Sequence, residues 1–167
     1  MSLARLGRRL AAAVLACAAL LAAPVWAEDS GADPTHAQPL LRMEPLEIVT
    51  SRGAYHFKVE IADTDRRQQV GLMYRPALRA DRGMLFEFSR PQEVDFWMKH
   101  CPVPLDMLFI EADGTILSIA RNTAPYSEEP IPSGGPVTAV LEIRGGRAAE
   151  IGAQPGDRVR HRFFHHG

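Results

Sequence analysis

The chain has 167 residues, of which 46% are hydrophobic and 23% are charged, and its formal net charge at pH 7 is −1. This length is typical of a single domain and is sufficient for an ordinary hydrophobic core. Because no stretch concentrates the basic residues, the charge pattern excludes nucleic-acid binding by electrostatic attraction alone.

Residues 1–27 have the three parts of an export signal. Three arginines come first, the apolar run Leu10–Leu21 follows, and small residues up to Ala27 form a cleavage site. The run is shorter than the roughly 20 residues that a spanning helix needs. We therefore expect cleavage after Ala27 and a periplasmic or secreted protein without an integral membrane segment. Two alternatives remain, an uncleaved N-terminal anchor and lipidation at Cys17.

Cleavage changes the charge and cysteine counts of the mature chain. The signal contains three arginines and no acidic residue, which leaves 16 basic against 20 acidic residues. Cys17 is removed with it, so Cys101 remains alone in an oxidising compartment and no internal disulfide can form. Stability must then come from the hydrophobic core, and we expect a monomer or a weak dimer.

The mature chain alternates strand patterns with one helix in its first half. Residues 28–43 lack periodicity and are expected to form a flexible leader before a single β-rich domain at 44–164 and a tail at 165–167. Apolar alternation predicts strands at Leu46–Thr50 and Tyr55–Ile61. Asp63–Arg75 changes to a helical period, with Thr64 as its N-cap.

Strands dominate the second half. The predicted strands are Met84–Phe88, Val94–His100, Leu105–Ala112, Thr115–Ala120, Val137–Ile143 and Arg158–Phe164. Asp113-Gly114 predicts a tight hairpin, and Leu105–Ala112, apolar on both faces, is expected inside the sheet. A long loop at Asn122–Pro136 and a helical turn at Arg147–Ile151 complete the pattern. The fold class is therefore all-β, a sandwich or open barrel with one short amphipathic helix and a second helical turn.

A succession of short motifs runs through this domain. The motifs are Ala62-Asp63-Thr64, Gly71-Leu72-Met73-x-Arg75, Gly83-Met84-Leu85-Phe86, Phe96-Trp97-Met98-Lys99, Pro104-Leu105-Asp106, Asp113-Gly114, Ile131-Pro132-Ser133-Gly134-Gly135, Val140-Leu141-Glu142 and Gly156-Asp157. Their order closely resembles the domain of unknown function 192 family from Leu46 to Val159. The resemblance implies a compact β-rich fold in exported or membrane-tethered bacterial proteins and archaeal relatives, and no accepted reaction. The chain departs from it at His100-Cys101, where the family has Asn-Thr, and at Arg67-Gln68, where it has Glu-Arg.

The segment from Asp95 to Asp106 contains the densest candidate chemistry. On a strand, Asp95, Trp97 and Lys99 would share one face and could form a sugar- or peptide-binding platform; the alternative is a solvated face with Trp97 over a neighbouring strand. Asp106 falls on a buried strand, where a carboxylate needs a partner. Arg75 or Lys99 could supply it, or the carboxylate could cap backbone amides.

Cys101 has three interpretations: a buried inert thiol, an exposed redox-active or dimer-forming thiol, and a nucleophile. Its neighbour His100 would point the opposite way on a strand, so His56 or His161 would have to act as the base. Copper is a remote alternative, because methionine, histidine and cysteine are soft ligands, although no tight metal-ligand spacing is present. The candidate copper ligands are Met73, Met84, Met98, Met107, His100 and Cys101.

These observations favour a non-catalytic binding or accessory domain of the cell envelope, whose ligand would be a small molecule, a glycan or an envelope partner. The predicted ligand surface comprises Trp97, Lys99, Asp106 and Arg75, beside the loop Pro130–Pro136. No classical catalytic motif, cofactor motif or metal motif is present. The alternative is a hydrolase of envelope glycans or peptides that uses Asp106 and a second carboxylate.

Overall fold

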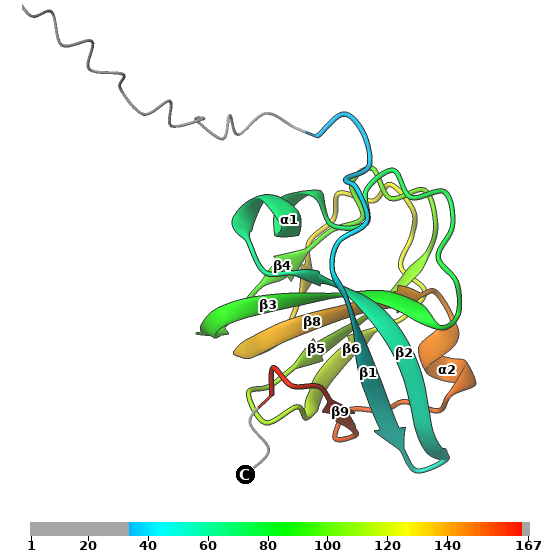
Figure 1. Ribbon diagram of the computed structural model, residues 1–167, viewed down its shortest axis with the longest axis vertical. Coiled ribbons are helices and arrows are strands. Elements are labelled where there is room, and N and C mark those ends of the chain that lie inside the picture. Colours follow the sequence, from blue (N-terminus) through cyan, green and yellow to red (C-terminus); the bar gives the residue numbers. More distant parts are fainter. Residues whose placement is uncertain (1–33, 165–167) are drawn as a thin grey trace, which may run out of the picture. The chain divides into compact units, whose positions relative to one another are not determined.

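The computed structural model describes residues 34–164 of the chain (Figure 1). Within this range two short helices, α1 (Asp65–Val70) and α2 (Arg147–Glu150), accompany nine strands. The strands are β1 (Met43–Thr50), β2 (Gly53–Ala62), β3 (Arg82–Gln92), β4 (Asp95–Phe96), β5 (Leu105–Ile110), β6 (Ile116–Ala120), β7 (Ile131–Pro132), β8 (Val137–Arg144) and β9 (Arg158–Arg160). The all-β fold class predicted from the sequence is therefore confirmed.

Seven of these strands form one curled sheet in the order β6-β5-β8-β3-β2-β1-β9. Only β2 and β3 pair in parallel, and the segment that contains α1 supplies the crossover that a parallel pair requires. The two edges meet, because Thr115 pairs with Arg158 and the amide of Val159 donates to the carbonyl of Gly114 at 2.8 Å. Because this contact is one isolated bridge and not a pair of hydrogen-bonded strands, the sheet is a curled, open barrel and not a sandwich of two equal layers.

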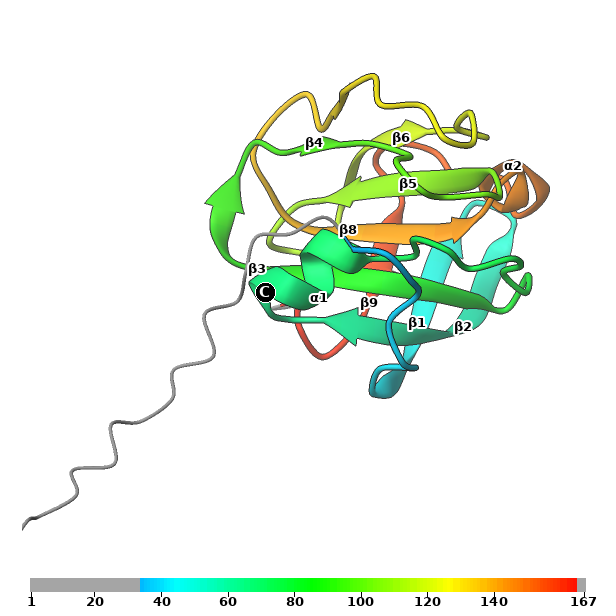
Figure 2. The ribbon, with the colours of Figure 1, turned by 90° about the horizontal axis from the view of Figure 1, so that it is seen from above.

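The sheet separates two hydrophobic cores. The inner core fills the barrel, where the alternating residues Phe57, Val59 and Ile61 of β2 meet residues of β5, β8 and α2. The outer core lies on the other face of β3, β5 and β8, under α1 and the small β4–β7 sheet. Figures 1 and 2 show α1 and β4 on the same side of β3 and β8. Strands β5 and β8 are buried on both faces, as the sequence predicts for β5.

Local signals place several elements where the sequence predicts them. The hydroxyl of Thr64 accepts a hydrogen bond from the amide of Arg67 at the start of α1. At the β5–β6 hairpin, Gly114 has a φ of +91° and the carboxylate of Asp113 accepts from the amide of Thr115 at 2.9 Å. The helical turn predicted at Arg147–Ile151 is α2.

The predicted strand at Val94–His100 is wrong beyond Phe96. The chain leaves the strand and turns, because the amide of Cys101 donates to the carbonyl of Met98 at 3.0 Å and His100 has a φ of +56°. Side chains in this segment therefore do not alternate as on a strand. The face that Asp95, Trp97 and Lys99 were expected to share does not exist.

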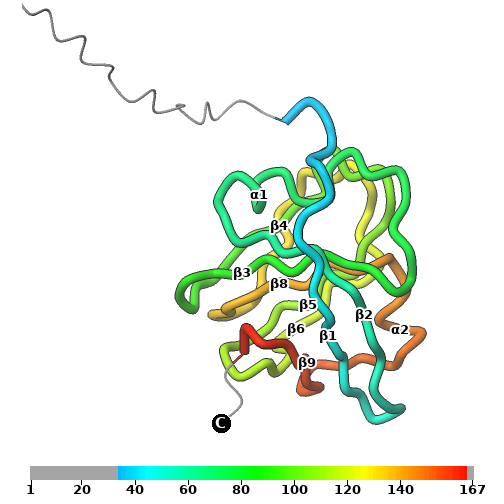
Figure 3. Tube along the Cα trace, in the orientation of Figure 1, coloured from blue at the N-terminus to red at the C-terminus, as the bar shows by residue number. Residues whose placement is uncertain are grey.

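The described part of the expected leader, residues 34–42, is hydrogen-bonded to the β-rich domain. The side chain of Gln38 donates to the carbonyl of Gly71 at 2.9 Å, and the amide of Leu41 donates to the carboxylate of Glu60 at 2.8 Å. Figure 3 shows this segment running past α1 into β1. The predicted signal and C-terminal tail lie outside the described residues. Neither helix within residues 34–164 has the length and hydropathy that a membrane crossing requires.

Candidate functional site

A pocket of about 190 Å³ opens between α1, β4 and the turn that follows β4. We call it the α1–β4 pocket. Apolar residues line part of it, and its other lining residues are Gln68, Gln69, Asp95, Trp97, Lys99, Cys101 and Glu142. Glu142 and Cys101 are buried at 4% and 5% exposure, whereas Trp97 is 49% exposed. The pocket thus runs from an exposed aromatic mouth to a buried acidic floor.

Glu142 is the most unusual group in this pocket. It lies in the middle of β8, opposite Met84 of β3 and Met107 of β5, so its carboxyl enters the outer core. Among the described residues, no hydrogen bond or ion pair reaches its side chain. Burial without a partner disfavours the charged form and raises the pKa of Glu142 to about 8. A buried carboxyl with a raised pKa in a pocket is typical of a functional site.

Cys101 shares the floor with Glu142. Burial, and secondarily the Glu142 carboxylate, raise the pKa of the Cys101 thiol to about 12. At neutral pH it is therefore a protonated thiol and a poor nucleophile. Neither candidate base is nearby: His56 lies 3.6 Å from Glu47 on the β1–β2 ribbon, and His161 lies 3.0 Å from Glu44. The geometry supports the inert-thiol interpretation.

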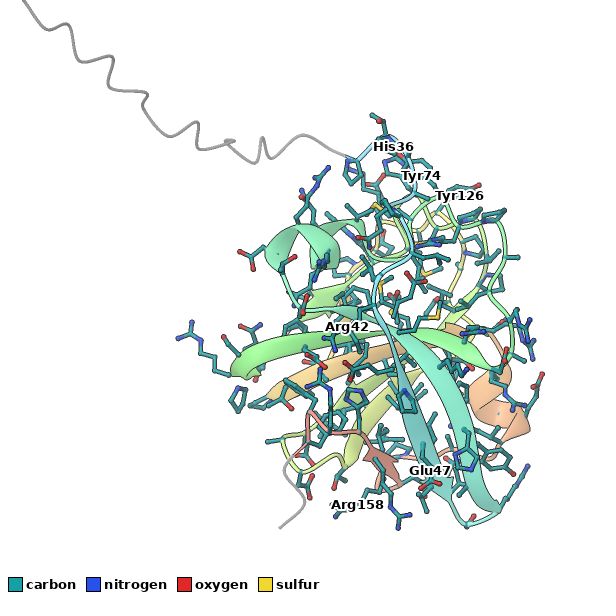
Figure 4. All side chains as sticks on the ribbon, viewed as in Figure 1. His36, Arg42, Glu47, Tyr74, Tyr126 and Arg158 are labelled. Carbon is teal, nitrogen blue, oxygen red and sulfur yellow. The ribbon has the colours of Figure 1, made fainter. Side chains whose placement is uncertain are left out.

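Trp97 and Lys99 meet at the mouth of the pocket, with the ammonium of Lys99 5.6 Å from the centre of the Trp97 ring. The turn that carries them is fixed from two sides. The amide of Met98 donates to the carbonyl of Ser127, and the amide of Tyr126 donates to the carbonyl of Cys101. On the other side the amide of Tyr74 donates to the carbonyl of His100 at 2.8 Å. Figure 4 shows Tyr74 and Tyr126 at the same end of the domain.

Asp106 lies outside the α1–β4 pocket and is fully buried. Its carboxylate accepts hydrogen bonds from three backbone amides, those of Asn122, Gly146 and Ala148, at 2.6, 3.1 and 2.7 Å. These bonds join β5 to the loop after β6 and to the start of α2. The amide-capping alternative is thus what the structure shows, and neither Arg75 nor Lys99 is its partner.

Arg75 also lies outside this pocket. Its guanidinium donates to the carboxylate of Glu60 at 3.1 Å, at the wall of a second cavity. The predicted set is therefore divided: Trp97 and Lys99 converge on one pocket, whereas Arg75 and Asp106 have structural partners elsewhere. The loop Pro130–Pro136 supports the pocket from behind, because β7 pairs with β4.

The candidate copper ligands do not gather around one point. Met84, Met98 and Met107 fill the outer core at 0% exposure, and His100 stacks on Tyr74 with ring centres 4.9 Å apart. Only Met73 and Cys101 of that set line the pocket. Within residues 34–164, no group of three histidine, cysteine or acidic side chains is close enough to hold a metal ion.

The profile of DUF192, described as Uncharacterized ACR, matches residues 47–161. The chain belongs to the DUF192 family. The predicted resemblance is confirmed over nearly the whole β-rich domain. The search of curated proteins returns no match for this DUF192 chain.

Two crystal structures share the DUF192 chain's fold. A protein of unknown function from Novosphingobium aromaticivorans is 39% identical, with a TM-score of 0.72, over 75% of this chain and 91% of that one. A Sinorhizobium meliloti protein, named as a candidate transcription regulator, is 40% identical, with a TM-score of 0.71, over 74% of this chain and 97% of that one. The family and these neighbours establish the fold and leave the biochemical role open.

Proposed function

We propose that this DUF192 chain is an exported small-ligand-binding module of the cell envelope and that its ligand occupies the α1–β4 pocket. The observation that carries the proposal is Glu142. A carboxyl buried without a partner costs the folded state free energy, which a stability role alone does not explain. A ligand that hydrogen-bonds Glu142 would remove this cost when it binds.

The lining of the pocket restricts the chemistry of the ligand. Asp95 and Glu142 are acidic, and among residues 34–164 Lys99 is the one basic residue that lines the pocket. Phe86, Phe96 and Trp97 add aromatic surface, which favours an apolar body and accommodates a cation against a ring face. A small molecule with an aromatic or aliphatic body and a hydrogen-bond-donating, positively charged head fits these groups.

The export and partner assignments rest on the sequence. The tripartite pattern of residues 1–27 supports a periplasmic or secreted location, with a monomer or weak dimer as the working form. The name of the S. meliloti structure does not lead us to propose DNA binding for this chain. Its 20 acidic residues outnumber its 19 basic ones, and removal of the signal would increase that excess.

A matched set of probes tests the pocket. Benzylamine, benzyl alcohol and benzoate share one ring and differ in the head group. In a protein-observed NMR titration at pH 8, benzylamine should bind most tightly and shift the indole signal of Trp97. Glu142→Gln should abolish the preference for benzylamine, whereas Glu93→Gln, the same change at an exposed site, should keep it. Equal affinity of all three probes for wild-type and Glu142→Gln protein would contradict the proposal.

Acid–base catalysis is a second candidate. It rests on the raised pKa of Glu142, near the pH at which a general acid or base works best, and on Asp95 in the same pocket. The earlier pairing through Asp106 has no support, because three amides hold that carboxylate outside the pocket. Release of a fluorophore from glycoside or peptide substrates, lost in both Glu142→Gln and Asp95→Asn, would favour this candidate over simple binding.

A further inference from the structure

A second cavity, of about 240 Å³, lies between β2, β3 and the loop that follows Arg75. It shares only Leu72 with the α1–β4 pocket. Its lining is strongly basic: Lys58, Arg75, Arg79 and Arg82 face a single acidic residue, Glu60. This composition contrasts with the chain's net charge of −1. We call it the basic cavity.

Two of its cations are placed against each other. Lys58 of β2 and Arg82 of β3 are register partners in the parallel pair, so their side chains leave the sheet on the same face. Like charges at opposed positions of neighbouring strands are destabilising. No carboxylate within residues 34–164 forms an ion pair with either of them, and the guanidinium of Arg82 donates to the sulfur of Met43 at 3.0 Å. The charge of Arg82 also acts on the carboxylate of Asp81, but that carboxylate is hydrogen-bonded to Arg79.

Glu60, the acidic residue of the cavity, already accepts hydrogen bonds from other groups. Glu60 accepts from the amide of Leu41 at 2.8 Å and from Arg75 at 3.1 Å, and Arg79 makes two hydrogen bonds to Asp81. Arg75 retains a buried Nε–H without a partner. Within residues 34–164, Lys58 and Arg82 thus have no carboxylate in an ion pair with them, and Arg75 has one unpaired N–H.

The remaining surface of the cavity is apolar. Leu72 is buried at its base, Leu78 comes from the covering loop, and Leu40 and Met43 form an exposed rim at 67% and 40% exposure. A cavity with cations on one wall and leucines on another matches an anion that carries a short hydrocarbon body. An inorganic anion would leave the apolar surface uncovered.

We propose that the basic cavity binds a small organic oxyanion, whose phosphate or carboxylate head lies between Lys58 and Arg82 and whose alkyl body packs on Leu72 and Leu78. Charge-assisted hydrogen bonds to such a head would relieve the repulsion between the two cations. This ligand differs from the one proposed for the α1–β4 pocket, and the two proposals stand or fall separately.

Calorimetric titration with butyl phosphate tests the proposal, with pentanoate, inorganic phosphate and butanol as matched probes. Wild-type protein should bind butyl phosphate or pentanoate at least about tenfold more tightly than inorganic phosphate or butanol. Lys58→Gln and Arg82→Gln should each weaken that binding by about tenfold or more. Arg90→Gln makes the same charge change at an exposed site away from the cavity and should leave it unchanged.

A readout without ligand accompanies the titration. Because Lys58 and Arg82 repel each other, Lys58→Gln should keep or raise the melting temperature of the ligand-free protein. Three results would overturn the proposal: no saturable binding of either organic anion, an equal loss of binding in Arg90→Gln, or binding to phosphatidylglycerol vesicles without binding of butyl phosphate. The last result would assign the surface to a membrane and not to a soluble ligand.

Discussion

Replacement of Glu142 by glutamine should stabilise the protein at neutral pH and abolish the preference of the α1–β4 pocket for benzylamine. Glutamine has the shape of the protonated carboxyl and carries no ionisable group. The pKa of Glu142 is about 8 in the folded chain, against a reference value of 4.5 for the unfolded chain. At neutral pH the unfolded wild-type chain has an ionised Glu142, so this side chain must take up a proton when the protein folds. The variant has no ionisable group at this position and does not bear this cost.

The magnitude follows from this difference in pKa. Below pH 4.5 Glu142 is protonated in both the folded and the unfolded wild-type chain, so it does not lower the free energy of unfolding. As the pH rises from 4.5 through 8, the free energy of unfolding falls by about 1.4 kcal/mol per pH unit. At pH 7 the loss is about 3 kcal/mol, and Glu142→Gln should exceed wild type by that amount. For a domain of this size the melting temperature should rise on the order of 10 °C.

Urea unfolding of both proteins at pH 4.5, 6, 7 and 8 measures this effect. The two free energies of unfolding should agree at pH 4.5 and diverge steadily up to pH 8. Glu93→Gln should follow wild type throughout. A Glu142→Gln variant that is less stable than wild type by a constant amount would refute the reasoning, because it would mean that the folded protein holds an ionised, well-partnered Glu142.

Three further results are expected from single positions. Asp106→Asn should lower the free energy of unfolding by about 3 kcal/mol in denaturant titration, since an amide cannot accept from three backbone donors as a carboxylate does; an unchanged value would count against the capping role. Trp97→Ala should weaken benzylamine binding while the free energy of unfolding changes by only about 0.5 kcal/mol, and a large destabilisation would instead make Trp97 a core residue. Iodoacetamide should modify Cys101 in the native protein on the order of 100-fold more slowly than in the urea-unfolded chain at pH 8, whereas equal rates would exclude a buried thiol.

The fold could be predicted because its signals are local. Alternation in Tyr55–Ile61 marks the inner face of β2, the cap at Thr64 starts α1, and Asp113-Gly114 sets the β5–β6 hairpin. Each of these depends on residues within one turn or one strand. The strand expected at Val94–His100 ends at Phe96 because the chain turns, with His100 at a positive φ. Histidine is enriched at positive φ, but the conformation is uncommon even for this residue type, so the sequence alone did not predict the turn.

The site could be predicted only in part because its contacts are remote in sequence. Trp97 and Lys99 were named correctly as neighbours, although a turn and not a strand brings them together. The partners of Asp106 are backbone amides up to 42 positions away, which carry no side-chain signal. The sequence contains one signal for Glu142, because it is an acidic residue within the apolar run of β8. Its burial could not be predicted, because it depends on α1 and β4, which lie far from β8 in the sequence.

In the ligand-free protein Glu142 is expected to be protonated and without a hydrogen-bond partner, and a ligand in the α1–β4 pocket is expected to supply that partner. The most direct test is a carbon-13 NMR titration of the Glu142 carboxyl in the free protein and in the presence of saturating benzylamine. We predict a midpoint near pH 8 in the free protein and a clearly lower midpoint with benzylamine bound. A midpoint near the ordinary value of 4.5 in the free protein, unchanged by benzylamine, would contradict the claim.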